Sequence, residues 1–297
     1  MTSVEELTVQ VPWGQIAVKL WGPTADLKIM AVHGLNDNAA SFDQLIPLLG
    51  GGLCVACVDL PGHGRSSPLP LGLLPSPLHL AWALRRVVDH FQWGRFDLLS
   101  HSMGGHVAVY LSALFATSIT RVCLIDGFFA HVIPEGDFVL ERCQVVLDKL
   151  LRHESQTNKH LYTYEESLSK LGRDRQTNLG IESIRALQKR AFSKTTNGYV
   201  YNNDSRMKLL TYPLITLDFH LGLIRRMDCR LLMISTSQFE PFLSTPATKR
   251  SLVELQQTLG SRMQTVRVEG SHDVHMDQPL NLVPIIKQFF SCQKCLL

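Results

Sequence analysis

The residues from Ser100 to Gly105, SHSMGG, have the types and spacing of a serine nucleophile held at a sharp turn. They lie where the buried run RFDLL passes directly into an apolar helical pattern, and such a strand-to-helix turn exposes the side chain at its tip. The backbone there is crowded, so the positions two before and two after the nucleophile need small residues. Gly104 meets this need, and Ser100 stands where glycine is usual. We predict that Ser102 is a nucleophile.

A second candidate is a histidine late in the chain, because a serine hydroxyl is a weak nucleophile until a base takes its proton. Around this type of turn the order along the chain is serine, acid, histidine. The segment GSHDVH (270–275) follows the predicted strand MQTVRVE and contains two histidines. We predict that His272 is the base. His275 lies one helical turn further on and better suits a supporting role.

The acid that orients this base is less evident. The run CRLLMIST (229–236) is expected to be followed by an aspartate, but the next residues are SQFEP and contain only Glu240. A glutamate can accept the imidazole N–H as an aspartate does. Asp126, at the end of the preceding buried run RVCLIDG, is the alternative. We favour Glu240 as the acid and keep Asp126 as its rival.

Two backbone amides are candidates for holding a negatively charged oxygen. Leu35 follows His33 and Gly34 at the end of the first buried run, and Met103 begins the helix after Ser102. N–H groups at these places could form an oxyanion hole. We expect His33 to order this loop, and the glycine-dense segment Asp59–Ser66 to be a scaffold turn.

The elements that must position these residues alternate between strand and helix. Residues 7–21 read as a hairpin, and helical spacing is found over 41–49, with Ser41 as its cap, over 77–91 and over 279–290. Short apolar runs between them predict an α/β fold, with a mostly parallel sheet and helices on both faces. The stretch 128–227 is long, polar and helical in spacing with almost no strand signal. We predict a core of residues 1–127 and 228–297 and a helical cap insertion over 128–227.

Composition supports one globular core and excludes several functions. Of 297 residues, 45% are hydrophobic and 19% charged, and the net charge of +3 is spread along the chain. No nucleic-acid partner is expected from this distribution. Cys54 and Cys57 would point to opposite faces of a strand, so no metal is expected there, and Cys292 and Cys295 read as a loose tail. The other buried cysteines are expected to be reduced, and no cofactor is predicted.

Targeting signals are also weak. The start MTSVEELTVQV has no apolar core typical of a secretory signal, and no run of 18 apolar residues occurs. The ending is not a prenylation or peroxisomal motif. We therefore expect a cytoplasmic protein with no membrane span.

Five segments together resemble the serine hydrolase-like proteins of the α/β-hydrolase superfamily: VPWGQIAVKLWG, HGLNDNAASFDQLIPLL, DLPGHGRSS, SHSMGG and GSHDVHMDQP. The resemblance covers nearly the whole chain. It implies a nucleophile at Ser102, a base at His272 and membership of the capped, peptidase S33-like hydrolases. It also implies a peroxisomal or vesicular location as an alternative. Ser100 and the missing aspartate after residue 236 depart from the pattern.

The leading hypothesis is a serine hydrolase that cleaves an ester or thioester of a small substrate with an apolar acyl part. Apolar residues of the predicted cap could line its pocket: Phe128, Phe129, Phe138, Leu147, Leu150 and Leu151. The alternative is an inactive pseudohydrolase that binds a small molecule or a protein. A carboxylate within about 3 Å of His272 would favour the enzyme. Relatives of the fold that attack with a carboxylate are disfavoured because residue 102 is serine.

Overall fold

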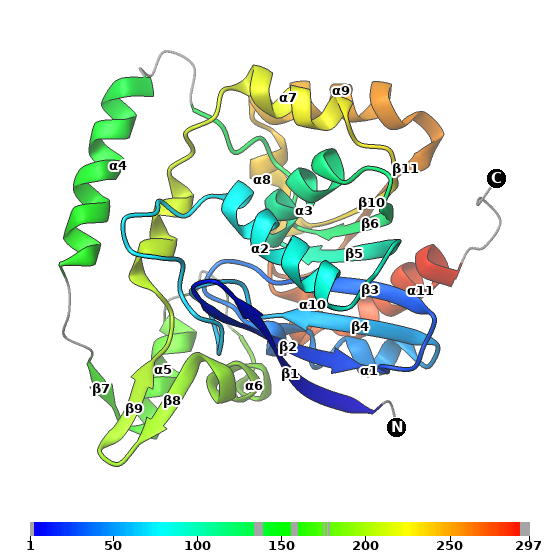
Figure 1. Cartoon of the computed structure of the whole chain (residues 1–297). Coiled ribbons are helices and arrows are strands. Elements are labelled where there is room, and N and C mark those ends of the chain that lie inside the picture. The colour runs from blue at the N-terminus through cyan, green and yellow to red at the C-terminus, as the bar shows by residue number, and fades with distance from the viewer. Residues whose placement is uncertain are drawn as a thin grey trace.

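An eight-stranded sheet forms the centre of the molecule, seen in a computed structural model that describes residues 3–133, 139–155, 160–173, 175, 177 and 179–291 (Figure 1). Its strands are β1 (Val4–Val11), β2 (Gly14–Trp21), β3 (Leu27–Val32), β4 (Leu53–Val58), β5 (Phe96–His101), β6 (Ile119–Ile125), β10 (Arg230–Thr236) and β11 (Met263–Val268). Their order is β1-β2-β4-β3-β5-β6-β10-β11. The β1–β2 and β2–β4 pairs are antiparallel and the others are parallel. This confirms the predicted, mostly parallel sheet with an antiparallel start.

Helices cover both faces of the sheet. One apolar core packs α2 (Pro77–His90), α3 (Met103–Leu114), α7 (Leu217–Arg225) and α9 (Pro246–Leu259) against one face. A second core packs α1 (Ile46–Leu49), α10 (Val274–Asp277) and α11 (Val283–Ser291) against the other. The remaining short elements are α8 (Glu240–Leu243), η1 (Ala39–Phe42), η3 (Ser237–Phe239), η4 (Gly260–Arg262) and η5 (Pro279–Asn281). The predicted α/β class is therefore confirmed.

The helix expected over residues 41–49 is instead two short pieces, η1 and α1. The predicted cap, Ser41, lies inside η1, whereas the side chain of Asn38 accepts the N–H of Ala40 and caps it. Pro47 near the start of α1 has no N–H to donate to a preceding turn, so the helix begins again there. The prediction of Ser41 as the cap was wrong because Asn38 provides a side-chain acceptor one turn earlier.

The segment between β6 and β10, residues 126–229, is called the insertion here. It contains α4 (Val139–Glu154), β7 (Leu161–Tyr162), α5 (Tyr164–Arg173), α6 (Ile181–Ala191), β8 (Phe192–Thr195), β9 (Gly198–Tyr201) and η2 (Ser205–Thr211), and it ends with α7. In Figure 1, α4 stands at the side of the molecule, and β7–β9 with α5 and α6 lie below it. The three strands form a small antiparallel sheet that helical spacing did not predict. Gly198, with a φ of +138°, lets the chain turn between β8 and β9.

Ion pairs, one of them fully buried, attach the insertion to the core. Arg190 of α6 donates to Asp59, which follows β4, and to Glu6 of β1. The amide of Asn38 also donates to the carbonyl of Leu187 on α6. Because the buried charges of Arg190 and Asp59 are costly to separate, α6 is held firmly beside the carboxyl ends of the strands.

Two predictions from composition concern cysteines and membrane spans. Cys54 belongs to one apolar core and Cys57 to the other, so the two side chains do point to opposite faces. Cys292 and Cys295 lie outside the described residues. None of the described helices combines the length and the apolar character needed to cross a bilayer.

Candidate active site

Ser102 occupies the sharp turn between β5 and α3. Its backbone has φ 51° and ψ −123°, a left-handed conformation that is unfavourable for serine. The turn is held because Ser102 N–H donates to the carbonyl of Ile125 at 3.1 Å and Gly105 N–H donates to the carbonyl of Ser102 at 2.8 Å. The strained turn lifts the hydroxyl out of the sheet, as the strand-to-helix pattern predicts.

The two glycines after Met103 are required by crowding rather than by φ. A Cβ atom on Gly104 would lie 2.2 Å from the carbonyl oxygen of Val32, and one on Gly105 would lie 2.0 Å from that of Gly127. Both contacts are with backbone, which cannot move aside without shifting a strand or loop. Ser100 is wholly buried in β5, so its small hydroxymethyl group is accommodated there.

His272 lies beside this serine. Its Nε2 is 2.9 Å from Ser102 Oγ, although 170 residues separate the two in the sequence. Its side chain is 33% exposed, which leaves one edge of the ring open to the site. The structure therefore brings together the serine and the histidine that the sequence predicts as a nucleophile and its base.

The carboxylate next to His272 is Asp126, which corrects the preference for Glu240. Asp126 Oδ2 is 3.2 Å from His272 Nδ1. The N–H and hydroxyl of Thr236 donate to its two oxygens at 2.6 and 2.5 Å, fixing its orientation. Glu240 lies at the start of α8 on the surface, where it pairs with Arg267 at 3.2 Å. The short η3 turn after β10 directs Glu240 outward, so it does not join this group.

The two amides predicted to form an oxyanion hole lie near Ser102. Leu35 lines the same cavity as Ser102, and Met103 is the first residue of α3. The nearby His33 is buried and orders the loop, because its Nε2 accepts the N–H of Leu60 at 3.0 Å and its Nδ1 contacts the carbonyl of Gly34 at 2.8 Å. Its pKa is lowered by burial.

Two residues that sequence reasoning missed hold the backbone of His272. Gln238 accepts the N–H of His272 at 3.1 Å, and His101 Nε2 contacts its carbonyl at 2.9 Å. His101 immediately precedes Ser102, and Gln238 lies in the loop expected to carry the acid. Adjacency to predicted site residues was the only sequence signal for either of them.

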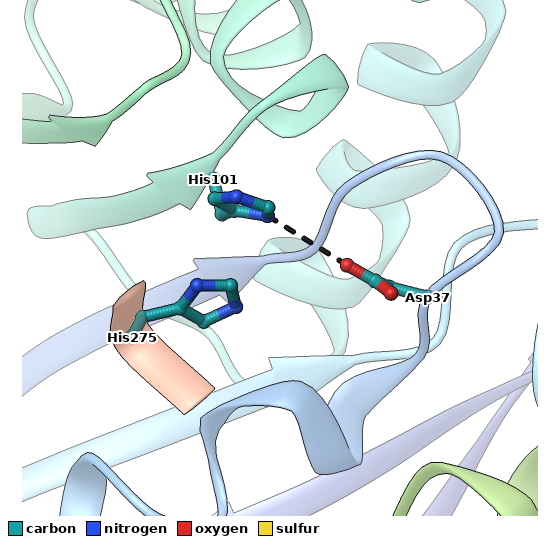
Figure 2. A group of neighbouring side chains, drawn as sticks. All are labelled: Asp37, His101 and His275. Atoms are coloured by element: carbon teal, nitrogen blue, oxygen red, sulfur yellow. Dashed lines mark ion pairs between the residues drawn. The ribbon is translucent and has the colours of Figure 1, made fainter. Parts of the chain in front are cut away.

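His101 also belongs to a buried cluster with Asp37 and His275, drawn in Figure 2. His101 Nδ1 is 3.6 Å from Asp37 Oδ2, and the rings of His101 and His275 are in contact, tilted by 36° with centroids 3.9 Å apart. Burial opposes a charged imidazole, but Asp37 more than offsets it, so the pKa of His101 is raised. Burial lowers the pKa of His275 well below its usual value. His275 thus packs behind the site, where the sequence places a supporting residue.

Arg175 of the insertion completes this cluster. Its guanidinium donates to Asp37 and, at 2.9 Å, to Asp273, which follows His272 directly. The hydroxyl of Thr177 donates to the other oxygen of Asp273. Burial alone would raise the pKa of Asp37, yet Arg175 and His101 hold it well below its ordinary range.

The donor atoms of Asp37, His101 and His275 lie within 4.8 Å of one another, so a metal ion must be considered. Imidazole lone pairs lie in the ring plane, and at a centroid distance of 3.9 Å and a tilt of 36° the rings of His101 and His275 face each other rather than both turning an edge to one point. Asp37 is also already paired with the cation of Arg175. These features favour an ion-pair cluster over a metal centre.

Comparison with known proteins identifies the family. The family model described as "alpha/beta hydrolase fold" matches residues 29–205. A Drosophila melanogaster protein named "Probable serine hydrolase" is 30% identical over 97% of this chain and 88% of its own length. The chain belongs to the α/β-hydrolase family. The expected resemblance to serine hydrolase-like proteins is therefore confirmed.

Two further proteins are similar to this α/β-hydrolase. A crystal structure of a hypothetical protein from Pseudomonas aeruginosa PAO1 superposes with a TM-score of 0.83 at 26% identity, covering 97% of this chain and 99% of that one. A Neisseria meningitidis pimeloyl-[acyl-carrier protein] methyl ester esterase is 33% identical over 116 residues, which are 39% of this chain and 42% of that protein. The first supports the fold over its whole length, and the second covers part of it.

The cavity of this α/β-hydrolase has a volume of about 370 Å³ and opens over Ser102 and His272. Side chains of the insertion contribute to its wall: Phe129, Leu171, Arg175, Thr177, Tyr201 and Thr211. Phe129 was expected there, but its neighbour Phe128 packs into the core. Leu147 and Leu151 are exposed on α4, Leu150 is buried, and none of the three lines this cavity. Phe138 lies outside the described residues.

Proposed function

We propose that this α/β-hydrolase is a serine hydrolase that cleaves an ester or thioester of a small molecule with an apolar acyl part. The observation that carries the proposal is the continuous line from Ser102 Oγ to His272 Nε2 at 2.9 Å and from His272 Nδ1 to Asp126 at 3.2 Å. The ester bond is further supported by the partial match to a methyl ester esterase.

In the first half of the proposed reaction, Ser102 Oγ attacks the carbonyl carbon while His272 Nε2 takes the hydroxyl proton. The carbonyl oxygen becomes an oxyanion, to which the N–H groups of Leu35 and Met103 donate. Asp126 accepts from Nδ1–H, so it holds the ring in the tautomer with a free Nε2 lone pair and stabilises the imidazolium. As the intermediate collapses, His272 returns the proton to the leaving oxygen or sulfur.

In the second half, water replaces the leaving group. His272 Nε2 takes a proton from the water, whose oxygen attacks the acyl-enzyme carbonyl. Collapse of the second tetrahedral intermediate breaks the bond to Ser102 Oγ, and the proton on His272 returns to the serine. The products are a carboxylic acid and an alcohol or thiol, with no cofactor used.

The alternative, a binding protein without turnover, would be favoured if no carboxylate could reach His272. Asp126 lies within hydrogen-bonding reach and is itself oriented by Thr236. Nothing in this arrangement favours binding alone, so we retain the enzyme as the single proposal.

We further propose that residues 128–227 act as the cap of this enzyme. Leu171, Arg175 and Tyr201 come from this stretch and face the same cavity as Ser102. A cap at this position limits the size and shape of the substrate that reaches Ser102.

A fluorescent fluorophosphonate tests the nucleophile, because it phosphonylates a serine only when a base activates it. We expect wild-type protein to be labelled at Ser102, identified by mass spectrometry of the peptide, and Ser102→Ala and His272→Ala to lose labelling. Ser193→Ala, in exposed β8, is the matched control and keeps it. Folded wild-type protein that resists labelling at high probe concentration would overturn the proposal.

A further inference from the structure

Three phenylalanines form one continuous aromatic surface, which we call the aromatic wall: Phe129, Phe239 and Phe242. The rings of Phe239 and Phe242 stack with centroids 5.3 Å apart, and Phe129 lies 5.4 Å from Phe242 and 6.0 Å from Phe239. The ring of buried His106 packs edge-on against Phe129 at 4.5 Å. Such mutual contacts hold the three rings in fixed positions.

The aromatic wall faces the reacting groups. All three rings line the cavity that contains Ser102 and His272. Phe239 lies parallel to the imidazole of His272, with ring planes 8° apart and centroids 5.8 Å apart. A substrate carbonyl placed on Ser102 would therefore carry its substituents alongside these rings.

Packing within the protein does not use the whole wall. Phe239 is 4% exposed and anchors it, Phe129 is half-buried, and Phe242 is 45% exposed. Phe128, the neighbour of Phe129, is 2% exposed and lies in the main core. The chain therefore directs one ring inward and the next toward the cavity, which leaves apolar surface available beside the nucleophile.

The origin of this wall lies in the position of the acid. Asp126 is supplied by the end of β6, so the loop after β10 does not have to present a carboxylate to His272. That loop instead turns Glu240 outward to Arg267 and presents Phe239 and Phe242 inward. The segment SQFEP, which made the acid difficult to identify from the sequence, thus contributes Phe239 to the cavity wall.

The geometry points to the aromatic wall as the binding site for an apolar group of the substrate, a short to medium alkyl chain or a single aryl ring. This inference rests on the proposed hydrolase function. The volume of about 370 Å³ is near the lower end for small-molecule pockets, which favours one such group over a long-chain lipid. Arg175 and Thr177 also line the cavity, but Asp37 and Asp273 already hold their polar groups, whereas the three rings offer a continuous apolar surface.

Two series of esters test the wall and identify which side of the ester it binds. The first series varies the acyl group, as p-nitrophenyl acetate, butyrate, hexanoate and octanoate. The second keeps acetate and varies the alcohol, as ethyl, hexyl and phenethyl acetate, followed by acid release. We expect wild-type kcat/KM to rise with apolar size in one series at least.

The decisive variant is Phe242→Ala, because this ring is the most exposed of the three. We expect it to lower the ratio of kcat/KM for hexanoyl over acetyl, or for hexyl over ethyl, by about tenfold. Phe129→Leu, which keeps an apolar side chain, should lower the ratio less. Val253→Ala, on the exposed side of α9, is the matched control and should leave it unchanged. A ratio in Phe242→Ala equal to that of wild type would overturn the inference.

A binding measurement separates this inference from the hydrolase proposal. Ser102→Ala cannot form an acyl-enzyme, so calorimetric titration with the ethyl and hexyl esters reports binding alone. Tighter binding of the hexyl ester that is lost in Ser102→Ala/Phe242→Ala supports the wall even if wild-type protein shows no turnover. Equal affinity for both esters would reject the wall whether or not the protein is an active hydrolase.

Discussion

Asp126 Oδ2 lies 3.2 Å from His272 Nδ1, although 146 residues separate these two side chains in the sequence. Asp126 follows β6, and Thr236, which holds both of its oxygens, ends the neighbouring strand β10. The acid is thus fixed by the sheet itself. The proposed reaction therefore depends on this contact rather than on the surface loop that carries Glu240.

Replacing Asp126 with asparagine should nearly abolish turnover. The amide keeps the shape but cannot favour the Nδ1–H tautomer of His272, so we expect kcat to fall by roughly 10³- to 10⁴-fold. Hydrolysis of p-nitrophenyl butyrate and the rate of fluorophosphonate labelling measure this directly. Glu240→Gln is the matched control and should stay within about twofold of wild type, because surface pairs contribute little. An active Asp126→Asn with an inactive Glu240→Gln would contradict this assignment.

Gly105→Ala should disrupt the sharp turn between β5 and α3 and destabilise the protein, whereas Gly222→Ala should not. A Cβ on Gly105 would lie 2.0 Å from the carbonyl of Gly127, while nothing lies within 4 Å of one on Gly222 in α7. We expect Gly105→Ala to lower the free energy of unfolding by about 3 kcal/mol or more, and Gly222→Ala to raise it by roughly 0.5 to 1 kcal/mol. Urea unfolding followed by circular dichroism gives both values, and equal values would refute the crowding argument.

Removing the charge of Arg175 should destabilise the protein strongly. Arg175→Gln would leave the buried carboxylates of Asp37 and Asp273 without their cation, at a cost of about 3 to 5 kcal/mol. Arg225→Gln removes an exposed guanidinium from Glu254 and should destabilise the protein far less, because solvent screens that pair. The same denaturant titration compares them. A small loss for Arg175→Gln would mean that water or another group compensates those carboxylates.

Stability should fall in mild acid, partly through His220. Burial, with a smaller contribution from His131, lowers the pKa of His220 to about 4, whereas an unfolded histidine titrates near 6.5. Between these values the unfolded chain binds the extra proton, so the free energy of unfolding decreases as the pH falls. Over the whole range from pH 6.5 to pH 4, this proton lowers the free energy of unfolding by about 3 kcal/mol. His220→Leu should remove that part of the pH dependence. Val253→Ala should keep the wild-type slope.

Local sequence patterns were sufficient to select Ser102 and His272 as candidates and to predict most of the sheet. Ser102 and His272 each follow a strand at a recognisable turn, and the structure places their side chains 2.9 Å apart. The acid could not be chosen in this way. Asp126 and Glu240 both follow strands that end at the same edge of the sheet, and only the direction of each side chain separates them.

The insertion was the hardest part to predict from the sequence. Its small sheet, β7–β9–β8, uses strands of two to four residues, too short for a reliable periodic pattern. Arg175 and Thr177 could not be assigned either, because their partners Asp37 and Asp273 come from distant loops. Such contacts depend on how the insertion lies over the core, which short-range spacing does not encode.

The ion pairs of Arg190 with Asp59 and Glu6 attach one part of the insertion, α6, to the core more firmly than the rest. Arg175 adds a second attachment near α5, whereas α4 packs against η2 and lies outside both. We therefore expect the part of the insertion around α5 and α6 to be held more rigidly over the core than α4 is.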